Sequence, residues 1–224
     1  MKHQEGLHIR NTGEIMARRY ILMGDIVGSS TYKASKLRRE FMQIVSSCNK
    51  TLEGEILSPY TITLGDEFQG VARSLRGLLD AVFYLEEISL LKRLKFKMRY
   101  VGLYSKIDTP IDRIKAHGMM GAGLTQARGM LTAAKRRGKP RFQFELPDDQ
   151  MTKELNLLFL VIDGIIAKWD SDDGPLILDM ITNNNNVEVG KRHKKNRTQI
   201  WKRRKNMLIE EFRALKEVVF DLAI

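Results

Sequence analysis

The sequence is poor in the residues and patterns that mark several large protein classes. Its 224 residues include one cysteine, Cys48, so an internal disulfide is impossible, and no Cys/His cluster has zinc-site spacing. No apolar run approaches the roughly 20 residues of a membrane-spanning helix, and the N-terminus shows no signal-peptide segment. We therefore expect a soluble protein that contacts no membrane and resides in the reducing environment of the cytoplasm.

Acidic residues are missing from one segment, and this concentrates the positive charge of the chain. The formal net charge is +11, yet residues 191–205 carry nine Lys and Arg residues and no Asp or Glu. The rest of the chain is therefore almost neutral. A short basic element of this kind is expected where a protein contacts a polyanion, although a solvated, solubilising tail has the same composition.

The first part of the chain alternates between strand-like and helix-like patterns. Residues 1–16 are polar and aperiodic, and we interpret them as a disordered or peripheral leader, with Met16 as an alternative start. The remaining patterns predict strands at 20–23, 60–64, 67–72, 96–104 and 141–144, and helices at 31–53, 75–94 and 124–137. The order is βαββαβ followed by αβ, and the βαββαβ part predicts a ferredoxin-like open sheet with its two helices on one face, within residues 17–147.

Beyond Pro147-Asp148-Asp149 the composition shifts and only helical patterns follow. They predict helices at 151–169, 175–181, 187–193 and 197–223. The expected fold class is therefore α+β, with a ferredoxin-like domain at 17–147 followed by a small all-α domain at 148–224.

Two carboxylates stand at turns of the first domain. Asp25 ends the first strand and Asp66 lies in the hairpin turn, and these two elements are neighbours in a ferredoxin-like sheet. Two carboxylates together with nucleotide phosphates suit Mg²⁺, and Glu67 is a candidate outer ligand. The alternative is structural, because Gly-Asp is a common turn dipeptide and an Asp after a strand often caps a helix.

The turn after Asp25 leads into a helix, where backbone N–H groups and the helix dipole favour a phosphate group. We therefore predict that this turn binds a nucleotide phosphate through five consecutive residues, Ile26, Val27, Gly28, Ser29 and Ser30.

The two segments that contain Asp25 and Asp66 resemble motifs of known protein families. Residues 24–30 (GDIVGSS) and 64–68 (LGDEF) resemble the metal-binding strand end and hairpin of class III nucleotide cyclases. The closer resemblance is to the SatD-like family, which has Asp-Ile-Val-Gly-Ser and Thr-Leu-Gly-Asp-Glu-Phe-Gln-Gly motifs and a helix with Ala-Arg. It covers most of residues 18–221 and implies a cyclase-type palm domain joined to a helix-turn-helix.

The cyclase resemblance also implies roles for single residues. Asp25 and Asp66 match the metal carboxylates, and Arg128 matches the catalytic arginine that stabilises the transition-state phosphates. This chain departs from the pattern at Leu124, where cyclases usually have Asn, and at Thr63, close to the expected adenine-selecting Lys. Because cyclases pair two catalytic domains, the resemblance further implies a homodimer.

The basic segment fits the spacing of a helix-turn-helix. Gly190 and Ile200 are ten residues apart, as are the small and apolar residues of that motif, and Asn196 is a good N-cap for the second helix. We expect Ile200 and Trp201 to supply the local core, with Trp201 in a packing role. The expected DNA contacts, to base edges and phosphates, are Arg197, Thr198, Gln199, Lys202, Arg203 and Arg204.

Three functions remain open at this point. The first is a DNA-binding transcriptional regulator with duplex DNA as partner, whose palm binds a nucleoside triphosphate or other nucleotide with Mg²⁺, or serves as sensor and dimerisation domain. The second is an active Mg²⁺-dependent nucleotide cyclase or nucleotidyltransferase that uses Asp25 and Asp66. The third is a degenerate palm that acts as an interaction scaffold.

Overall fold

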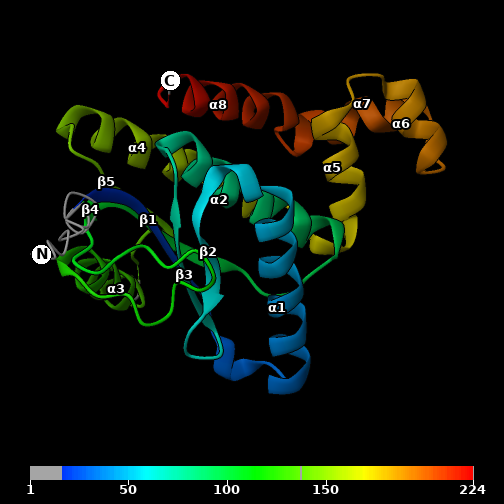
Figure 1. The fold of residues 1–224 in the computed structure, drawn as a ribbon. Coiled ribbons are helices and arrows are strands. Elements are labelled where there is room, and N and C mark those ends of the chain that lie inside the picture. The colour runs from blue at the N-terminus through cyan, green and yellow to red at the C-terminus, as the bar shows by residue number, and fades with distance from the viewer. Residues whose placement is uncertain (1–16, 137, 224) are drawn as a thin grey trace, which may run out of the picture.

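The computed structural model describes residues 17–136 and 138–223, so the predicted leader lies outside the described residues. Its centre is one mixed sheet with the strand order β2-β3-β1-β4-β5 (Figure 1). Neighbouring strands are antiparallel except for β4 and β5, which are parallel. The strands are β1 (Arg18–Ile26), β2 (Ile56–Ile62), β3 (Glu67–Ala72), β4 (Met98–Lys106) and β5 (Phe142–Glu145). The α+β class and the predicted βαββαβ order are confirmed.

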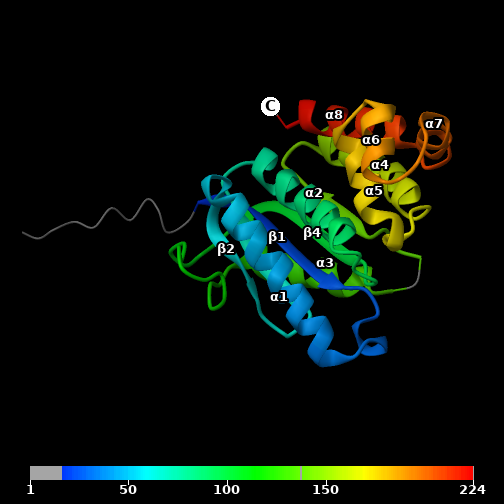
Figure 2. The ribbon, with the colours of Figure 1, turned by 90° about the vertical axis from the view of Figure 1, so that its right-hand side faces the viewer.

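The two helices of the predicted βαββαβ unit lie on one face of the sheet, as expected, and the helix that follows this unit covers the other face. α1 (Ala34–Thr51) and α2 (Leu75–Leu91) pack on one side, and α3 (Ala122–Ala134) packs on the other (Figure 2). Because successive strand residues point to opposite faces, β1 contributes Leu22 to the core under α1 and α2 and Ile21 to a second core under α3.

The edge strand β2 begins earlier than predicted. It starts at Ile56 and runs through Pro59, which we had placed before the strand. Its pairing with β3 shifts register between Ile56 and Ser58 and between Ser58 and Thr61. Proline is tolerated at such an irregular edge because its missing N–H leaves no ladder hydrogen bond unmade.

The C-terminal part is entirely helical, as predicted, but its last predicted helix is two helices. Leu208, with φ of 56°, separates α7 from α8. The helices are α4 (Asp149–Ile166), α5 (Gly174–Thr182), α6 (Asn186–Arg192), α7 (Arg197–Asn206) and α8 (Ile209–Asp221). Within the described residues, no helix is long and apolar enough to cross a membrane.

An aromatic cluster joins the C-terminal helices to α2. The Phe83 ring of α2 lies 5.5 Å from Phe159 of α4, and 6.3 Å and 5.3 Å from Phe212 and Phe220 of α8, measured between ring centroids. These rings belong to one buried core that extends from the sheet into the C-terminal helices. The helical part is thereby fixed against the sheet rather than joined by a linker.

Candidate nucleotide and nucleic-acid sites

Four charged residues meet at one end of the sheet face that α3 covers. The strand register places Asp25 of β1 between Glu67 of β3 and Arg99 of β4, and Lys135 follows α3. An Arg99 guanidinium nitrogen donates to both Asp25 oxygens at 3.0 and 2.9 Å. The Lys135 ammonium lies 3.3 Å from Asp25 and 2.7 Å from Glu67. We call Asp25, Glu67, Arg99 and Lys135 the palm charge cluster.

Burial controls the electrostatics of the palm charge cluster. Asp25 is only 1% exposed, and this burial raises the pKa of its carboxyl group, while Arg99 and Lys135 oppose the rise. Desolvation lowers the pKa of Lys135, but the carboxylates of Glu67 and Asp25 outweigh it and leave that pKa raised. The two neighbouring cations therefore offset part of the cost of burying the Asp25 carboxylate.

The hairpin turn lies beside the end of β1, as the sequence predicted. The Ile26 N–H donates to the Asp66 carbonyl at 3.1 Å, and the Ser29 hydroxyl donates to the Asp66 carboxylate at 2.6 Å. The backbones that carry Asp25 and Asp66 are thus adjacent.

Of the predicted magnesium pair, Asp25 is already engaged with protein cations, whereas the Asp66 carboxylate accepts from the Ser29 hydroxyl. Both Asp25 oxygens accept from Arg99, and Lys135 holds a positive charge against Asp25 and Glu67. Among the described residues, no three His, Cys, Asp or Glu side chains gather in a way that could hold a metal ion. The carboxylate oxygens of Asp25 and Asp66 have the chemistry that Mg²⁺ prefers, but the ion would have to displace Lys135 from Asp25.

The turn predicted to bind phosphate differs from the expectation in two ways. The N–H groups of Ile26 and Val27 already donate to the Asp66 and Lys97 carbonyls, so they are not free to bind a phosphate. The turn also does not enter α1 directly, because a short 3-10 turn (Ser29–Thr31) and two further residues precede Ala34. The remaining candidates for a phosphate contact are Gly28, Ser29 and Ser30.

Arg128 reaches the same face of the sheet from α3. Its guanidinium group donates to the Gln69 side chain at 3.1 Å, and Gln69 is two residues from Glu67 on β3. Leu124, the departure from the cyclase pattern, is buried in the core beneath α3. The position therefore serves packing in this chain, which explains why an apolar residue occupies it.

The basic segment forms a close-packed helix pair, α6 and α7. Asn196 caps α7 as predicted, and its exchange of hydrogen bonds with Gln199 completes a capping box. A Cβ atom on Gly190 would lie 2.5 Å from the Lys195 carbonyl oxygen, so only glycine fits at this approach. The predicted turn and close crossing are both present, with Lys194 at φ of 52° in the turn.

The six predicted DNA contacts divide into two groups. Arg197, Thr198 and Lys202 are exposed on α7. Trp201, expected to pack locally, is 52% exposed on this helix, so Ile200 supplies the local core without it.

The other three predicted contacts make hydrogen bonds or ion pairs within the protein. Arg204 is only 4% exposed, and its guanidinium group donates to the Met180 and Asn183 carbonyls and to the side chains of Asn186 and Glu210. The Arg203 guanidinium group pairs with the Asp173 carboxylate at 2.7 Å. The Gln199 side chain accepts from the Asn196 N–H at 2.8 Å within the capping box.

Arg99 and Lys135 are functional candidates that the sequence analysis did not identify. The alternation of Lys95, Lys97 and Arg99 with apolar residues was a usable signal for Arg99, because it places these basic residues on one face of a strand. No local pattern pointed to Lys135, whose position depends on the placement of α3.

Three comparisons with known proteins bear on the identity of the chain, and one of them assigns a family. No curated protein matches this chain. Among solved structures, the chain is similar to a bacterial light-regulated adenylyl cyclase, with a TM-score of 0.44 and 14% identity over 58% of this chain and 76% of that chain. The model of the SatD family matches residues 20–209. The match extends over most of the sequence, and the chain therefore belongs to the SatD family.

Proposed function

We propose that this protein binds duplex DNA through the α6–α7 pair and acts as a transcriptional regulator. The observation that carries the proposal is the uncompensated charge of this pair. Six of its basic residues make no ion pair with any acidic residue in the described part of the chain: Lys191, Lys194, Lys195, Arg197, Lys202 and Lys205. Positive charge without an internal partner is what phosphate groups attract.

The folded state of the segment argues against a solubilising tail. A solvated tail needs no capping box, no glycine at a close backbone approach and no buried arginine, whereas this segment has all three. The exposed residues also follow one stripe of α7, because Arg197, Trp201 and Lys205 are four residues apart, as are Thr198 and Lys202. This stripe is the surface that we place against DNA.

We propose fewer DNA-contacting residues than the six expected from the sequence. Arg203 and Arg204 are held by Asp173 and by buried carbonyl groups, so we assign them to the fold and not to phosphate binding. Gln199 would have to leave its capping box to read a base edge. The proposed contacts are therefore Arg197, Thr198 and Lys202.

The test is a titration of a fluorescent random-sequence duplex at fixed salt. Replacing Arg197 and Lys202 together by alanine should weaken binding about tenfold. The matched control removes Lys50 and Lys92, two exposed lysines outside the segment, and should bind like the wild type. Equal losses from both double variants would reduce the effect to net charge and contradict the proposal.

A selection from random duplexes then tests sequence recognition. A homodimer, which the cyclase resemblance implies, would enrich a two-fold symmetric site whose half-sites are about 34 Å apart. No enrichment would leave only sequence-independent binding and would contradict a regulator.

A nucleotide-dependent function of the palm is the second candidate. It is favoured by the adjacency of Asp25 and Asp66 and by Arg128, which lies on the same sheet face. The proposed role is binding of a nucleoside triphosphate with Mg²⁺, in which the phosphates and the ion together would take over the partners of Lys135. Incubation with each nucleoside triphosphate and Mg²⁺ or Mn²⁺ tests both binding, by a melting-temperature shift, and turnover, by new products. No shift with any nucleotide would contradict this role.

A further inference from the structure

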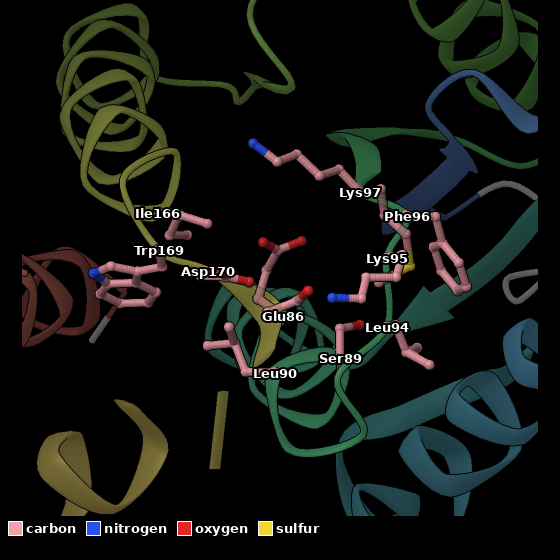
Figure 3. A pocket seen from close by; sticks show the side chains of 12 residues that line it. Glu86, Ser89, Leu90, Leu94, Lys95, Phe96, Lys97, Ile166, Trp169 and Asp170 are labelled. Carbon is pink, nitrogen blue, oxygen red and sulfur yellow. The ribbon is translucent and has the colours of Figure 1, made fainter. Parts of the chain in front are cut away.

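A cavity of about 400 Å³ lies between the sheet and the C-terminal helices. Figure 3 shows its lining, with one wall from the end of α2 and the segment 94–98 and the other from the end of α4 and the turn after it. This volume falls within the range of roughly 300–1,000 Å³ that is typical of small-molecule sites. None of the four residues of the palm charge cluster lines it.

The wall from α4 is apolar. Ile166 and Trp169 line the cavity and are largely buried, and Leu90 of α2 lies across from them. The Trp169 indole N–H donates to the Met207 carbonyl at 2.8 Å, which fixes the ring in place. A planar apolar group can therefore pack here without reordering the wall.

The acidic residues of the cavity already have hydrogen-bond partners within the protein. The Glu86 carboxylate accepts from the Arg141 guanidinium group at 2.9 and 3.0 Å and from the Tyr100 hydroxyl at 2.9 Å. Asp170 caps the following turn by accepting from the Asp172 N–H at 2.9 Å. The Glu86 carboxylate is therefore neutralised by Arg141, whereas Asp170 keeps its charge and is held as a cap.

The basic residues of the cavity are more available. Lys97 makes no ion pair with any acidic residue in the described ranges, and Lys95 pairs with Asp172 at 2.6 Å on the surface. Figure 3 shows both side chains extending from the sheet wall toward the opposite wall. Two lysine ammonium groups are therefore directed into the cavity from the sheet wall.

We propose that this cavity binds a small organic anion with a flat apolar body. Its negative group pairs with Lys95 and Lys97, and its body packs against Ile166 and Trp169. Such a ligand competes with Asp172 for Lys95. Asp172 belongs to the turn Ser171–Asp173, and Asp173 in that turn pairs with Arg203 of α7. The site is thus connected to the proposed DNA-binding helix through one short turn.

The test is isothermal titration calorimetry of the full chain, without DNA, with three probes of the same ring system. 1-Naphthoate and 1-naphthyl phosphate carry the negative group, and 1-naphthamide is neutral. We expect both anions to bind and the amide to bind at least about tenfold more weakly. The tighter of the two anions indicates whether the natural headgroup is a carboxylate or a phosphate.

Variants localise the binding. Lys97→Ala should weaken both anions about fivefold, the effect of losing one ion pair, and Lys95→Ala gives an independent second test. Lys92→Ala, which removes a nearby exposed lysine that does not line the cavity, should leave the affinities unchanged. Equal binding of the amide, unchanged affinity in both cavity variants, or no binding of any probe would overturn the proposal.

Discussion

The palm charge cluster and the α6–α7 pair are both rich in charge, but they manage it in opposite ways. In the palm charge cluster, two carboxylates and two cations neutralise one another around a carboxylate that is 1% exposed. In α6–α7, six basic residues have no acidic partner among the described residues. Burial makes the difference, because a buried charge is costly without a partner, whereas an exposed charge needs none and stays available.

The same contrast exists within α7 itself. Arg204 and Lys202 are two residues apart on one basic helix, yet Arg204 is buried among carbonyl groups and Lys202 faces solvent. Net charge alone therefore overstates the surface available to a polyanion. Three of the nine basic residues in 191–205 pair with an aspartate or a glutamate: Arg192, Arg203 and Arg204.

The largest expected effect is on stability, from the buried arginine of α7. Arg204→Met should lower the free energy of unfolding by about 3 kcal/mol, because it leaves buried carbonyl oxygens without a donor. Lys202→Ala should change it by less than about 0.5 kcal/mol. Urea denaturation measures both. A similar small change in the two variants would mean that α7 carries no internal anchor.

The next effect concerns the palm charge cluster and depends on pH. Arg99→Met should cost about 2 kcal/mol at pH 7, because Asp25 loses a cation in a buried position. Since burial raises the pKa of Asp25, the protonated carboxyl is favoured in the folded state as pH falls, and it no longer needs Arg99. The cost should therefore shrink between pH 7 and pH 4, as measured by urea denaturation.

The control for this prediction is Arg39→Met, which removes an exposed arginine from α1. It should change stability by less than about 0.5 kcal/mol at either pH. A cost of Arg99→Met that grows toward low pH would contradict the assignment of Arg99 as the counter-charge of Asp25.

A smaller effect tests whether α6 and α7 form a tight pair. Gly190→Ala places a methyl group 2.5 Å from the Lys195 carbonyl oxygen, so the turn must shift at a cost of about 1–2 kcal/mol. Thermal unfolding followed by circular dichroism measures this cost. Gly54→Ala, at a position with open space around the added atom, is the matched control. An unchanged melting temperature for Gly190→Ala would indicate a loose, tail-like segment.

The smallest effect is spectroscopic and compares the two tryptophans. Trp201 is 52% exposed, whereas Trp169 is 9% exposed. Acrylamide should quench the fluorescence of the Trp169→Phe variant, which retains Trp201, more strongly than that of the Trp201→Phe variant. Equal quenching would contradict the exposure of Trp201 on the proposed DNA-binding surface.

Most strands and helices could be predicted from the sequence, because the spacing of apolar residues along a short segment indicates whether it forms a strand or a helix. The placement of Asp25 beside the hairpin turn could also be predicted, since the order of elements fixes which strands are adjacent. The ion-pair partners of Asp25 could not be predicted from the sequence. Arg99 and Lys135 are far from it in sequence and reach it only through strand register and the position of α3 on the second face.

The burial of the Arg204 side chain could not be predicted from the sequence either. α7 is polar nearly all round, so its period gave no sign of which basic residue turns inward. Arg204 is buried because α7 lies against the C-terminal end of α5, where the Met180 and Asn183 carbonyl groups accept from it, and against the Asn186 side chain at the start of α6. The break at Leu208 was missed because a leucine at positive φ has no local signature.

The central claim is that the uncompensated charge of α6–α7 binds duplex DNA, and its most direct test is the salt dependence of that binding. A plot of log affinity against log salt concentration should have a slope of roughly −0.9 for each phosphate neutralised. Replacing Arg197 and Lys202 together should make this slope shallower by about two units. Replacing Lys50 and Lys92 should leave the slope unchanged. Identical slopes for the wild type and the Arg197/Lys202 variant would contradict the central claim.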